Sequence, residues 1–373
     1  MIKKILLPFL FVMLFILTPK AYAYSAKSYC VIEQNSKRIL ASSNEKVRMG
    51  MASTTKIMTA FVAVMHSNPN DVVTVSRKAS YTEGSSLYLK EGETIKMSDL
   101  IYGLMLNSGN DSAVAIAEHI SGSCEEFSKL MTQTAHEIGA SDTNFVNPNG
   151  LSDDNHYTTA YDLALITSKA LENEEFAKIV STKKYIGHTL NTNRALYFTN
   201  HNKLLSSING CVGVKTGFTK ATGRCLVSSV EKNGWQAVCV TLDAPDDWND
   251  HKQLFDYVFE KYSIRKIIDK NSILKTVDLN GSEEGGNLEI ACSEDVSVVM
   301  SDDDNVRINL DENLNEIEPI KKNDSVGNVQ FFLNDQLIDI KKAVAYNDVV
   351  FPKKRMFGFE IKKLFSKWLS LGR

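Results

Sequence analysis

A serine and a lysine three residues apart could act as a nucleophile and its base. Ser53-Thr54-Thr55-Lys56 begins an apolar stretch with helical periodicity, and residues i and i+3 share a helix face, so the Lys56 amine can reach the Ser53 hydroxyl. The start of a helix also offers free N–H groups and the positive dipole end, which can stabilise an oxyanion. The same S-x-x-K pattern begins at Ser43, Ser181, Ser229, Ser263 and Ser272. Only the helical context therefore distinguishes Ser53.

Lys56 can serve as a base at neutral pH only if its pKa falls well below the ordinary value of about 10.4. Burial and a second positive charge both lower the pKa of a lysine. Lys215 is the candidate for that second charge. The alternative interpretation is that Ser53 is a helix cap and Lys56 a surface charge.

Ser108-Gly109-Asn110 is a second candidate segment, between the apolar run 104–106 and a helical run at 113–117. A break between two helices can direct a hydroxyl and an amide into a cleft. The S-x-N pattern also occurs at Ser42 and Ser207. The alternative is an ordinary helix–helix turn in which Asn110 or Asp111 is the cap.

Lys215-Thr216-Gly217 is the third segment, and this tripeptide occurs once. With Phe218 and Thr219 it is expected at the edge of a strand. The ammonium and hydroxyl groups can bind a substrate carboxylate, and glycine lets a substrate backbone approach closely. The alternative is a basic residue in a glycine turn.

The elements that must position these segments are predicted from periodicity. We expect a hairpin over 28–42, a helix from Ser53, four more helices, two strands and a final helix over 249–262. The four helices are 98–106, 111–121, 124–138 and 159–172, and the strands are 224–231 and 235–242. Strands at both ends that enclose a helical block predict an α+β domain with one antiparallel sheet.

Short alternating runs follow from about residue 264, and they predict a small all-β domain. The runs are 287–291, 296–300, 306–310, 328–333 and 337–340. The predicted organisation is therefore a signal peptide (1–23), an α+β domain (24–263), an all-β domain (264–351) and a terminal amphipathic helix (352–373).

The signal peptide is predicted from Lys3 and Lys4, the uncharged run 5–17 and an A-x-A site ending at Ala23. The alternative is an uncleaved N-terminal anchor. The tail 352–373 carries seven basic residues and one acidic residue, and Phe357, Ile361, Leu364, Phe365 and Trp368 share one helical face. Such a helix suits an anionic membrane surface. The alternative is a helix that packs on its own domain.

Composition narrows the remaining classes of function. The chain of 373 residues is 43% hydrophobic and 23% charged, as in a globular protein. Residues 24–351 hold 32 basic and 44 acidic residues, so nucleic-acid binding is not expected. No CxxC or HExxH pattern occurs, and no metal or cofactor is predicted. The cluster of aspartates and a histidine at 246–251 is interpreted as a helix cap and not as a metal site. The six cysteines allow 15 pairings, and the sequence leaves their state open.

The order S-x-x-K, S-x-N, K-T-G, with each copy in its required context, is the signature of penicillin-recognising serine enzymes. Over roughly residues 24–262 the sequence resembles the low-molecular-mass penicillin-binding proteins, specifically serine-type D-alanyl-D-alanine carboxypeptidases. The stretches that carry the resemblance are 52–59, 106–111, 145–151 and 213–217. The β-rich segment and basic tail also fit the layout of that family.

The resemblance implies that Ser53 forms an acyl-enzyme, with Lys56 as its base. It implies that Ser108 passes a proton to the leaving D-alanine and that Asn110 holds the substrate amide. Lys215, Thr216 and Thr219 would face the terminal carboxylate, beside Gly217, and the N–H groups of Ser53 and Phe218 would form the oxyanion hole.

The implied activity is removal of the terminal D-alanine from peptidoglycan stem pentapeptides during cell-wall synthesis and remodelling, with β-lactams as inhibitors. The implied location is the outer face of the cytoplasmic membrane, with the tail as anchor. Two positions depart from the pattern. Phe218 stands where many members have histidine, and no arginine lies between Arg224 and Arg265, where some members place one that binds the carboxylate.

Two other functions remain open from the sequence. A β-lactamase would need a deacylating glutamate, and no convincing E-x-x-L-N loop lies between the second and third motifs. A non-catalytic module that binds the cell wall or senses β-lactams would carry the same motifs without turnover.

Overall fold

The computed structural model describes residues 24–279, 286–314 and 319–350. The chain divides into two compact units, Met1–Phe259 and Glu260–Arg373. The predicted signal peptide and the predicted terminal helix lie outside the described residues. Within the described ranges, no helix is both long and apolar enough to cross a membrane.

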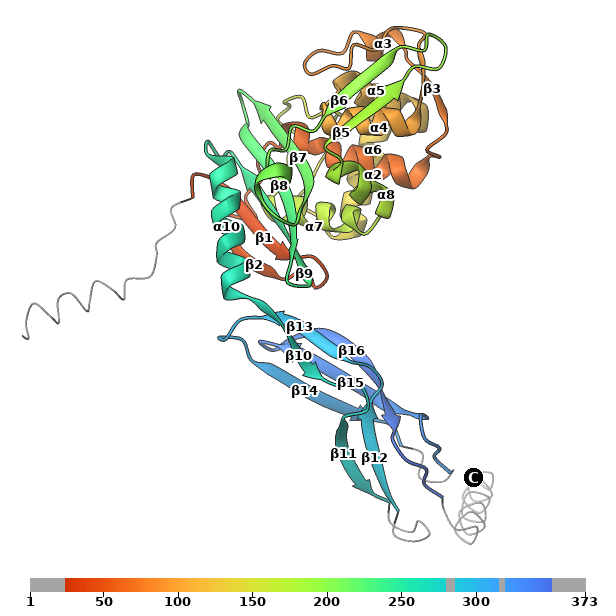
Figure 1. The fold of residues 1–373 in the computed structure, drawn as a ribbon, viewed down its shortest axis with the longest axis vertical. Helices are drawn as coiled ribbons and strands as arrows, with labels where there is room; N and C mark the ends of the chain where they lie inside the picture. The colour runs from red at the N-terminus through yellow and green to blue at the C-terminus, as the bar shows by residue number, and fades with distance from the viewer. Residues whose placement is uncertain (1–23, 280–285, 315–318, 351–373) are drawn as a thin grey trace, which may run out of the picture. The chain divides into compact units, whose positions relative to one another are not determined.

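One five-stranded antiparallel sheet forms the first layer of unit 1, in the order β2-β1-β9-β8-β7 (Figure 1). Its strands are β1 (Ser28–Glu33), β2 (Ile39–Ser43), β7 (Cys211–Thr219), β8 (Gly223–Lys232) and β9 (Trp235–Leu242). The first two strands come from the start of the unit and the others from its end, as the sequence predicts. The strand that carries Lys215, β7, therefore lies at one edge of the sheet.

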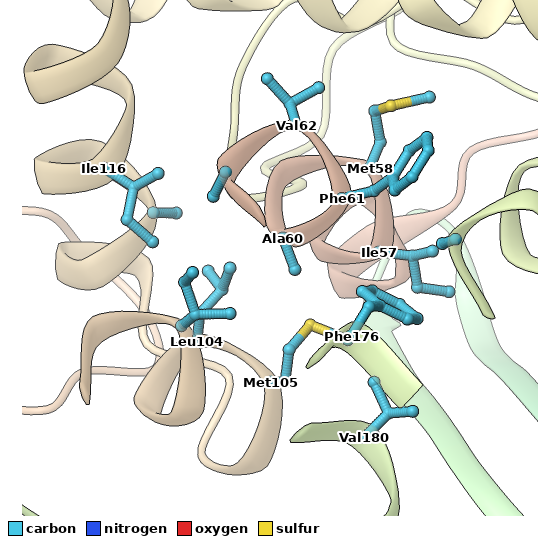
Figure 2. Packing of buried hydrophobic residues seen from close by; sticks show 14 of the residues in the cluster. Ile57, Met58, Ala60, Phe61, Val62, Leu104, Met105, Ile116, Phe176 and Val180 are labelled. Carbon is cyan, nitrogen blue, oxygen red and sulfur yellow. The ribbon is translucent and has the colours of Figure 1, made fainter. Parts of the chain in front are cut away.

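Helices form the second part of unit 1, around the central helix α2 (Lys56–His66). They are α4 (Met97–Leu106), α5 (Asn110–Ser121), α6 (Cys124–Ile138), α7 (Ala160–Leu171) and α8 (Glu174–Ser181). Figure 2 shows Ile57, Ala60 and Phe61 of α2 among buried side chains of α4, α5 and α8. Because α2 is buried from Lys56 to Ala63, it is held from several directions, which fixes the position of Ser53 and Lys56 at its start.

Smaller elements complete unit 1, and the sequence did not predict them. Two small two-stranded sheets pair β3 (Val72–Thr74) with β4 (Thr94–Lys96) and β5 (Lys184–His188) with β6 (Ala195–Thr199). Two one-turn helices are α3 (Arg77–Ser80) and α9 (Leu204–Ser207). The last helix is α10 (Asp247–Lys261), close to the predicted range.

After the end of α10, the regular elements in the described part of unit 2 are all strands, which confirms the all-β prediction. Five strands form a sheet in the order β11-β12-β16-β15-β14, and β10 pairs with β13. Their bounds are β10 (Ser263–Ile268), β11 (Ile273–Asp278), β12 (Asn287–Cys292), β13 (Val296–Met300), β14 (Val306–Glu312), β15 (Ser325–Leu333) and β16 (Gln336–Ala345). The unit has its own core, which includes Leu288, Ile290 and Phe331.

All six cysteines are free thiols, and five of them are buried. Burial raises the pKa of Cys30, Cys225 and Cys239, so these thiols stay protonated and behave as small apolar side chains. Within 246–251, Asp250 accepts hydrogen bonds from Ser25 and Ala26. Among the described residues no group of three or more His, Cys, Asp or Glu could hold a metal ion.

Candidate active site

The Lys56 amine is the centre of the site. Its Nζ lies 3.0 Å from Ser53 Oγ and 2.7 Å from Asn110 Oδ1, and it also donates to the carbonyl oxygen of Asn149. Ser53 sits on the single turn η2 (Ala52–Thr55), which runs directly into α2. The residue before the serine, Ala52, has a φ of 48°. The strained left-handed backbone at that point sets where the helix begins.

Burial lowers the pKa of the Lys56 amine, so that it can act as a base. Lys56 and Lys215 are 0% and 1% exposed, so Lys56 is not the surface charge of the alternative interpretation. Burial lowers the pKa of Lys56 well below its ordinary value, and the positive charge of Lys215 lowers it further, against the opposing effect of Asp111. Burial alone brings the pKa of Lys215 down to about 7. Lys215 is thus the second cation that the sequence suggested.

The second segment lies in the break between α4 and α5. Ser108 is buried, and its φ of 62° turns the chain sharply between the two helices. Asn110 begins α5 and connects Lys56 to the neighbouring loop, because its Nδ2 donates to the carbonyl oxygen of Glu83 at 2.6 Å. Asp111 holds the same loop by accepting from the backbone N–H groups of Leu87 and Leu89.

The third segment passes close to the nucleophile. A Cβ atom on Gly217 would lie 3.0 Å from the backbone nitrogens of both Ser53 and Thr54. Only glycine therefore lets β7 come this near to η2 without displacing either strand or turn. This approach places the N–H of Ser53 beside the K-T-G backbone, in the region where an oxyanion hole was expected.

Alternation along β7 sends its side chains to two faces. Lys215 and Gly217 face η2, so Thr216 and Phe218 belong to the opposite face. The Phe218 side chain is 63% exposed. Thr219 lies at the end of the strand, where its Oγ1 is 3.1 Å from the hydroxyl of Ser152.

Several residues of the site are not predicted from the sequence. The carbonyl of Asn149 contacts Lys56, and Gly150 follows it with a φ of 86° and no room for a side chain against the carbonyl of Ala52. Asn147 organises this loop by accepting from the backbone N–H of Gly150 at 2.7 Å. The stretch 145–151 supported the family resemblance, yet a role for a backbone carbonyl leaves no trace in residue type.

His156 is a second residue that was missed, and it supports η2 from behind. Its Nδ1 accepts from the N–H of Val146 at 3.1 Å, and its Nε2 lies 2.7 Å from Thr55 Oγ1. Because Nδ1 is an acceptor, the ring is neutral with its proton on Nε2. Burial lowers the pKa of His156 to about 4, which keeps it neutral. Thr55 Oγ1 in turn donates to the carbonyl oxygen of Ala52 at 2.7 Å.

A cavity of about 480 Å³ opens beside η2. It is bounded by the segment before the nucleophile, by the loop after Gly150 and by the turn between β7 and β8; its lining includes Ala52, Leu151, Ser152 and Thr222. A cavity of this size lies within the range of ligand pockets, and Ala52, the residue before the nucleophile, is part of its lining.

Comparisons with known proteins agree with this geometry. Residues 16–246 match the family described as D-alanyl-D-alanine carboxypeptidase, and residues 262–350 match the C-terminal domain of penicillin-binding protein 5. The D-alanyl-D-alanine carboxypeptidase DacF of Bacillus subtilis is 29% identical over 360 residues, which cover 93% of this chain and 90% of that protein.

Solved structures show the same likeness. Penicillin-binding protein 5 from Haemophilus influenzae superposes with a TM-score of 0.70 at 27% identity, over 89% of this chain and 99% of that one. A mutant of the Streptomyces K15 DD-transpeptidase covers 64% of this chain and 99% of its own, at 29% identity and a TM-score of 0.62. With motifs, sheet and buried lysine pair in agreement, this chain belongs to the family of serine-type D-alanyl-D-alanine carboxypeptidases, which are penicillin-binding proteins.

Proposed function

We propose that the chain releases the terminal D-alanine of peptidoglycan stem peptides through an acyl-enzyme on Ser53. The observation that carries this proposal is the set of contacts around Lys56 Nζ. A neutral amine has two N–H groups and one lone pair. The oxygens of Asn110 and Asn149 take the two N–H groups, which leaves the lone pair for the Ser53 hydroxyl.

In the proposed acylation, Ser53 Oγ attacks the carbonyl carbon between the two D-alanines while its proton passes to Lys56. The backbone N–H groups of Ser53 and Phe218 stabilise the resulting oxyanion. The proton then reaches the leaving amine through Ser108, the C–N bond breaks, and D-alanine departs. Water attacks the ester in the second half of the cycle and restores Ser53.

Substrate orientation is assigned to the remaining site residues. Asn110 would hold the substrate amide, and Lys215, Thr216 and Thr219 would face the terminal carboxylate next to Gly217. β-Lactams would acylate Ser53 as mimics of the same peptide. Neither a β-lactamase nor a non-catalytic module is favoured, since the matched family and the relatives are D-alanyl-D-alanine carboxypeptidases.

Release of D-alanine from a diacyl-D-Ala-D-Ala peptide tests the proposal. Wild type should release D-alanine and Ser53→Ala should not, while both should bind the peptide. A fluorescent penicillin should label wild type persistently, whereas rapid turnover of the label would indicate a β-lactamase. If wild type and Ser53→Ala were equally inactive, the proposed function would be wrong.

We also propose that the chain is exported and held at the outer face of the cytoplasmic membrane by residues 352–373. The supporting features are the signal-like segment 1–23 and the basic, amphipathic pattern of the tail. Full-length protein should sediment with vesicles that contain anionic lipid, and protein that ends at Phe351 should not. Equal sedimentation of the two forms would contradict this anchor.

A further inference from the structure

The cavity beside η2 has a definite place relative to the nucleophile. Its lining includes Ala52, the residue before Ser53, but not Lys215, which is assigned to the terminal carboxylate of the leaving D-alanine. Strand β7 leads from Lys215 to the cavity wall, because Thr219 at its end lies 3.1 Å from Ser152 between the hydroxyl oxygens. The leaving half of the substrate therefore extends towards Lys215, and the retained acyl half extends towards the cavity.

The cavity can hold a long side chain. Its volume of about 480 Å³ lies within the range of ligand pockets. Three separate segments form its walls, namely residues 48–52, residues 150–154 and the turn that contains Ala221 and Thr222. In a stem peptide, the residue before D-Ala-D-Ala carries the first long side chain of the acyl half. That side chain is therefore the part of the substrate that can enter the cavity.

Two carboxylates in the lining give the cavity a negative charge. Asp153 and Asp154 are both exposed. Asp153 Oδ1 accepts from the backbone N–H of Asn155 at 2.8 Å, and neither carboxylate forms an ion pair with a lysine or arginine of the described ranges. Both charges are thus available to a ligand.

The arginine of the lining does not neutralise these carboxylates, because it is already paired. Arg48 donates from Nε and Nη2 to Asp142 Oδ1, at 3.1 and 2.7 Å, and its guanidinium lies 4.8 Å from the ring centre of Tyr157. The imidazole of His156, also in the lining, is buried and neutral. An excess of negative charge therefore faces the cavity, at its end formed by the loop 150–154.

We propose that this cavity binds the side chain of the residue before D-Ala-D-Ala, and that Asp153 and Asp154 select a side chain that ends in a positively charged amine. This inference rests on the proposed function, because it assigns a further part of the same substrate. The methylene groups of a lysine-like side chain would lie against Leu151, and its ammonium group would donate to the two carboxylates.

Two peptides that differ in one charge test the inference. Both are Nα-acyl-Lys-D-Ala-D-Ala; one has a free Nε amine and the other an Nε-acetyl group. For wild type, kcat/KM should be roughly 5-fold higher with the free amine, as expected for exposed charge pairs, and the difference should shrink when salt is raised. Asp153→Asn/Asp154→Asn should treat the two peptides alike. Asparagine keeps an acceptor for the N–H of Asn155, so the local turn is retained.

An exposed acid outside the cavity provides the matched control. Glu125→Gln removes a negative charge from α6, where this side chain is 69% exposed, and should keep the preference for the free amine. An equal loss of preference in Glu125→Gln would mean that the whole protein's charge is responsible, and the assignment to the cavity would be wrong. A preference that survives Asp153→Asn/Asp154→Asn would also overturn it.

Binding to the inactive enzyme tests the cavity without turnover. In an NMR titration, Ser53→Ala should bind the free-amine peptide more tightly than the acetylated one. Addition of Asp153→Asn and Asp154→Asn to Ser53→Ala should abolish that difference. Absence of D-alanine release by wild type would refute the proposed function and leave this comparison intact. If Ser53→Ala bound the two peptides equally well, the inference would be overturned.

Discussion

At the scale of single residues, the proposed mechanism gives two buried lysines opposite tasks. In that mechanism Lys56 is neutral when it accepts a proton, and Lys215 is charged when it holds a carboxylate. Burial lowers the pKa of both lysines. Only the pKa of Lys56 is lowered further by a neighbouring positive charge, that of Lys215. The same burial therefore produces a base and, beside it, an anion-binding group that is still protonated at slightly acidic pH.

The pH dependence of kcat/KM should be bell-shaped. As pH rises, Lys56 loses its proton and the rate increases; above about 7, Lys215 loses its charge and the rate falls. Arginine stays charged throughout this range, so Lys215→Arg should lose the alkaline limb, whatever its absolute rate. Steady-state assays with the soluble peptide from pH 5 to 10 check this. A rate that climbs steadily to pH 10 in wild type would contradict it.

Gly217 should be intolerant of even one methyl group. In Gly217→Ala the added Cβ would lie 3.0 Å from two backbone nitrogens of η2, so Ser53 must shift. A contact of this length displaces its neighbours by a few tenths of an ångström. Since a full displacement of about 1 Å can cost about 100-fold, kcat/KM should fall by roughly 10-fold. Gly234→Ala is the control: Gly234 has a φ of 83° and open space around it, so only stability should fall. Equal activities of the two variants would contradict the prediction.

At the scale of elements, buried neutral histidines connect neighbouring parts of unit 1. His156 links the loop 146–156 to Thr55, and His251 of α10 lies 3.0 Å from Thr241 on β9. Burial lowers the pKa of His251 to about 3. Both rings bind a proton more readily in the unfolded chain, where the pKa is about 6.5.

Stability of unit 1 should fall on mild acidification. Between about pH 6.5 and pH 4 the unfolded chain protonates these histidines and the folded chain does not, so the free energy of unfolding decreases as pH falls. His156 alone should contribute a loss on the order of 2–3 kcal/mol across that range. Urea unfolding at pH 7.5 and 4.5 measures it, and His156→Gln should show a smaller pH effect. Equal pH effects in both proteins would argue against this account.

Sequence patterns predicted the longer elements well and the shorter ones poorly. The helices α4 to α7 and the strands β8 and β9 have long periodic stretches, and the structure confirms them. The hairpin of β5 and β6 and the strands β10 and β11 were missed, because their residues are largely exposed and mixed in character. Local patterns carry little signal where burial is weak.

The site was anticipated through its side chains and not through its backbone. The S-x-x-K, S-x-N and K-T-G residues lie in the segments that converge at Lys56, as expected. The carbonyl of Asn149 and the support by His156 depend on contacts between residues about 93 and 101 positions apart in the chain. No local pattern specifies such pairs, so only the folded arrangement reveals them.

At the scale of the whole molecule, the two units have separate hydrophobic cores, one within residues 30–242 and the other within 268–349. Every residue assigned to the site belongs to the first unit. A Streptomyces relative matches only 64% of this chain but nearly all of its own length, in keeping with a first unit that stands as a domain.

A chain that ends at Tyr262 should therefore fold and keep its activity on soluble peptides. We expect kcat/KM within about threefold of the full chain, because no site residue is removed. D-Alanine release and thermal unfolding of the shortened protein check this, with its Ser53→Ala form as the blank. An inactive but folded short form would show that unit 2 contributes to the site.

The buried lysine pair has a consequence for how this protein can evolve. Each amine gives up most of its hydration, and a charge on Lys56 would be repelled by that of Lys215, so we expect the native state to be less stable than the same fold with apolar side chains at both positions. Selection for stability alone would favour Met or Leu at positions 56 and 215, and these substitutions would abolish the activity. Retention of both lysines therefore indicates selection for activity on a substrate, at the expense of thermal stability.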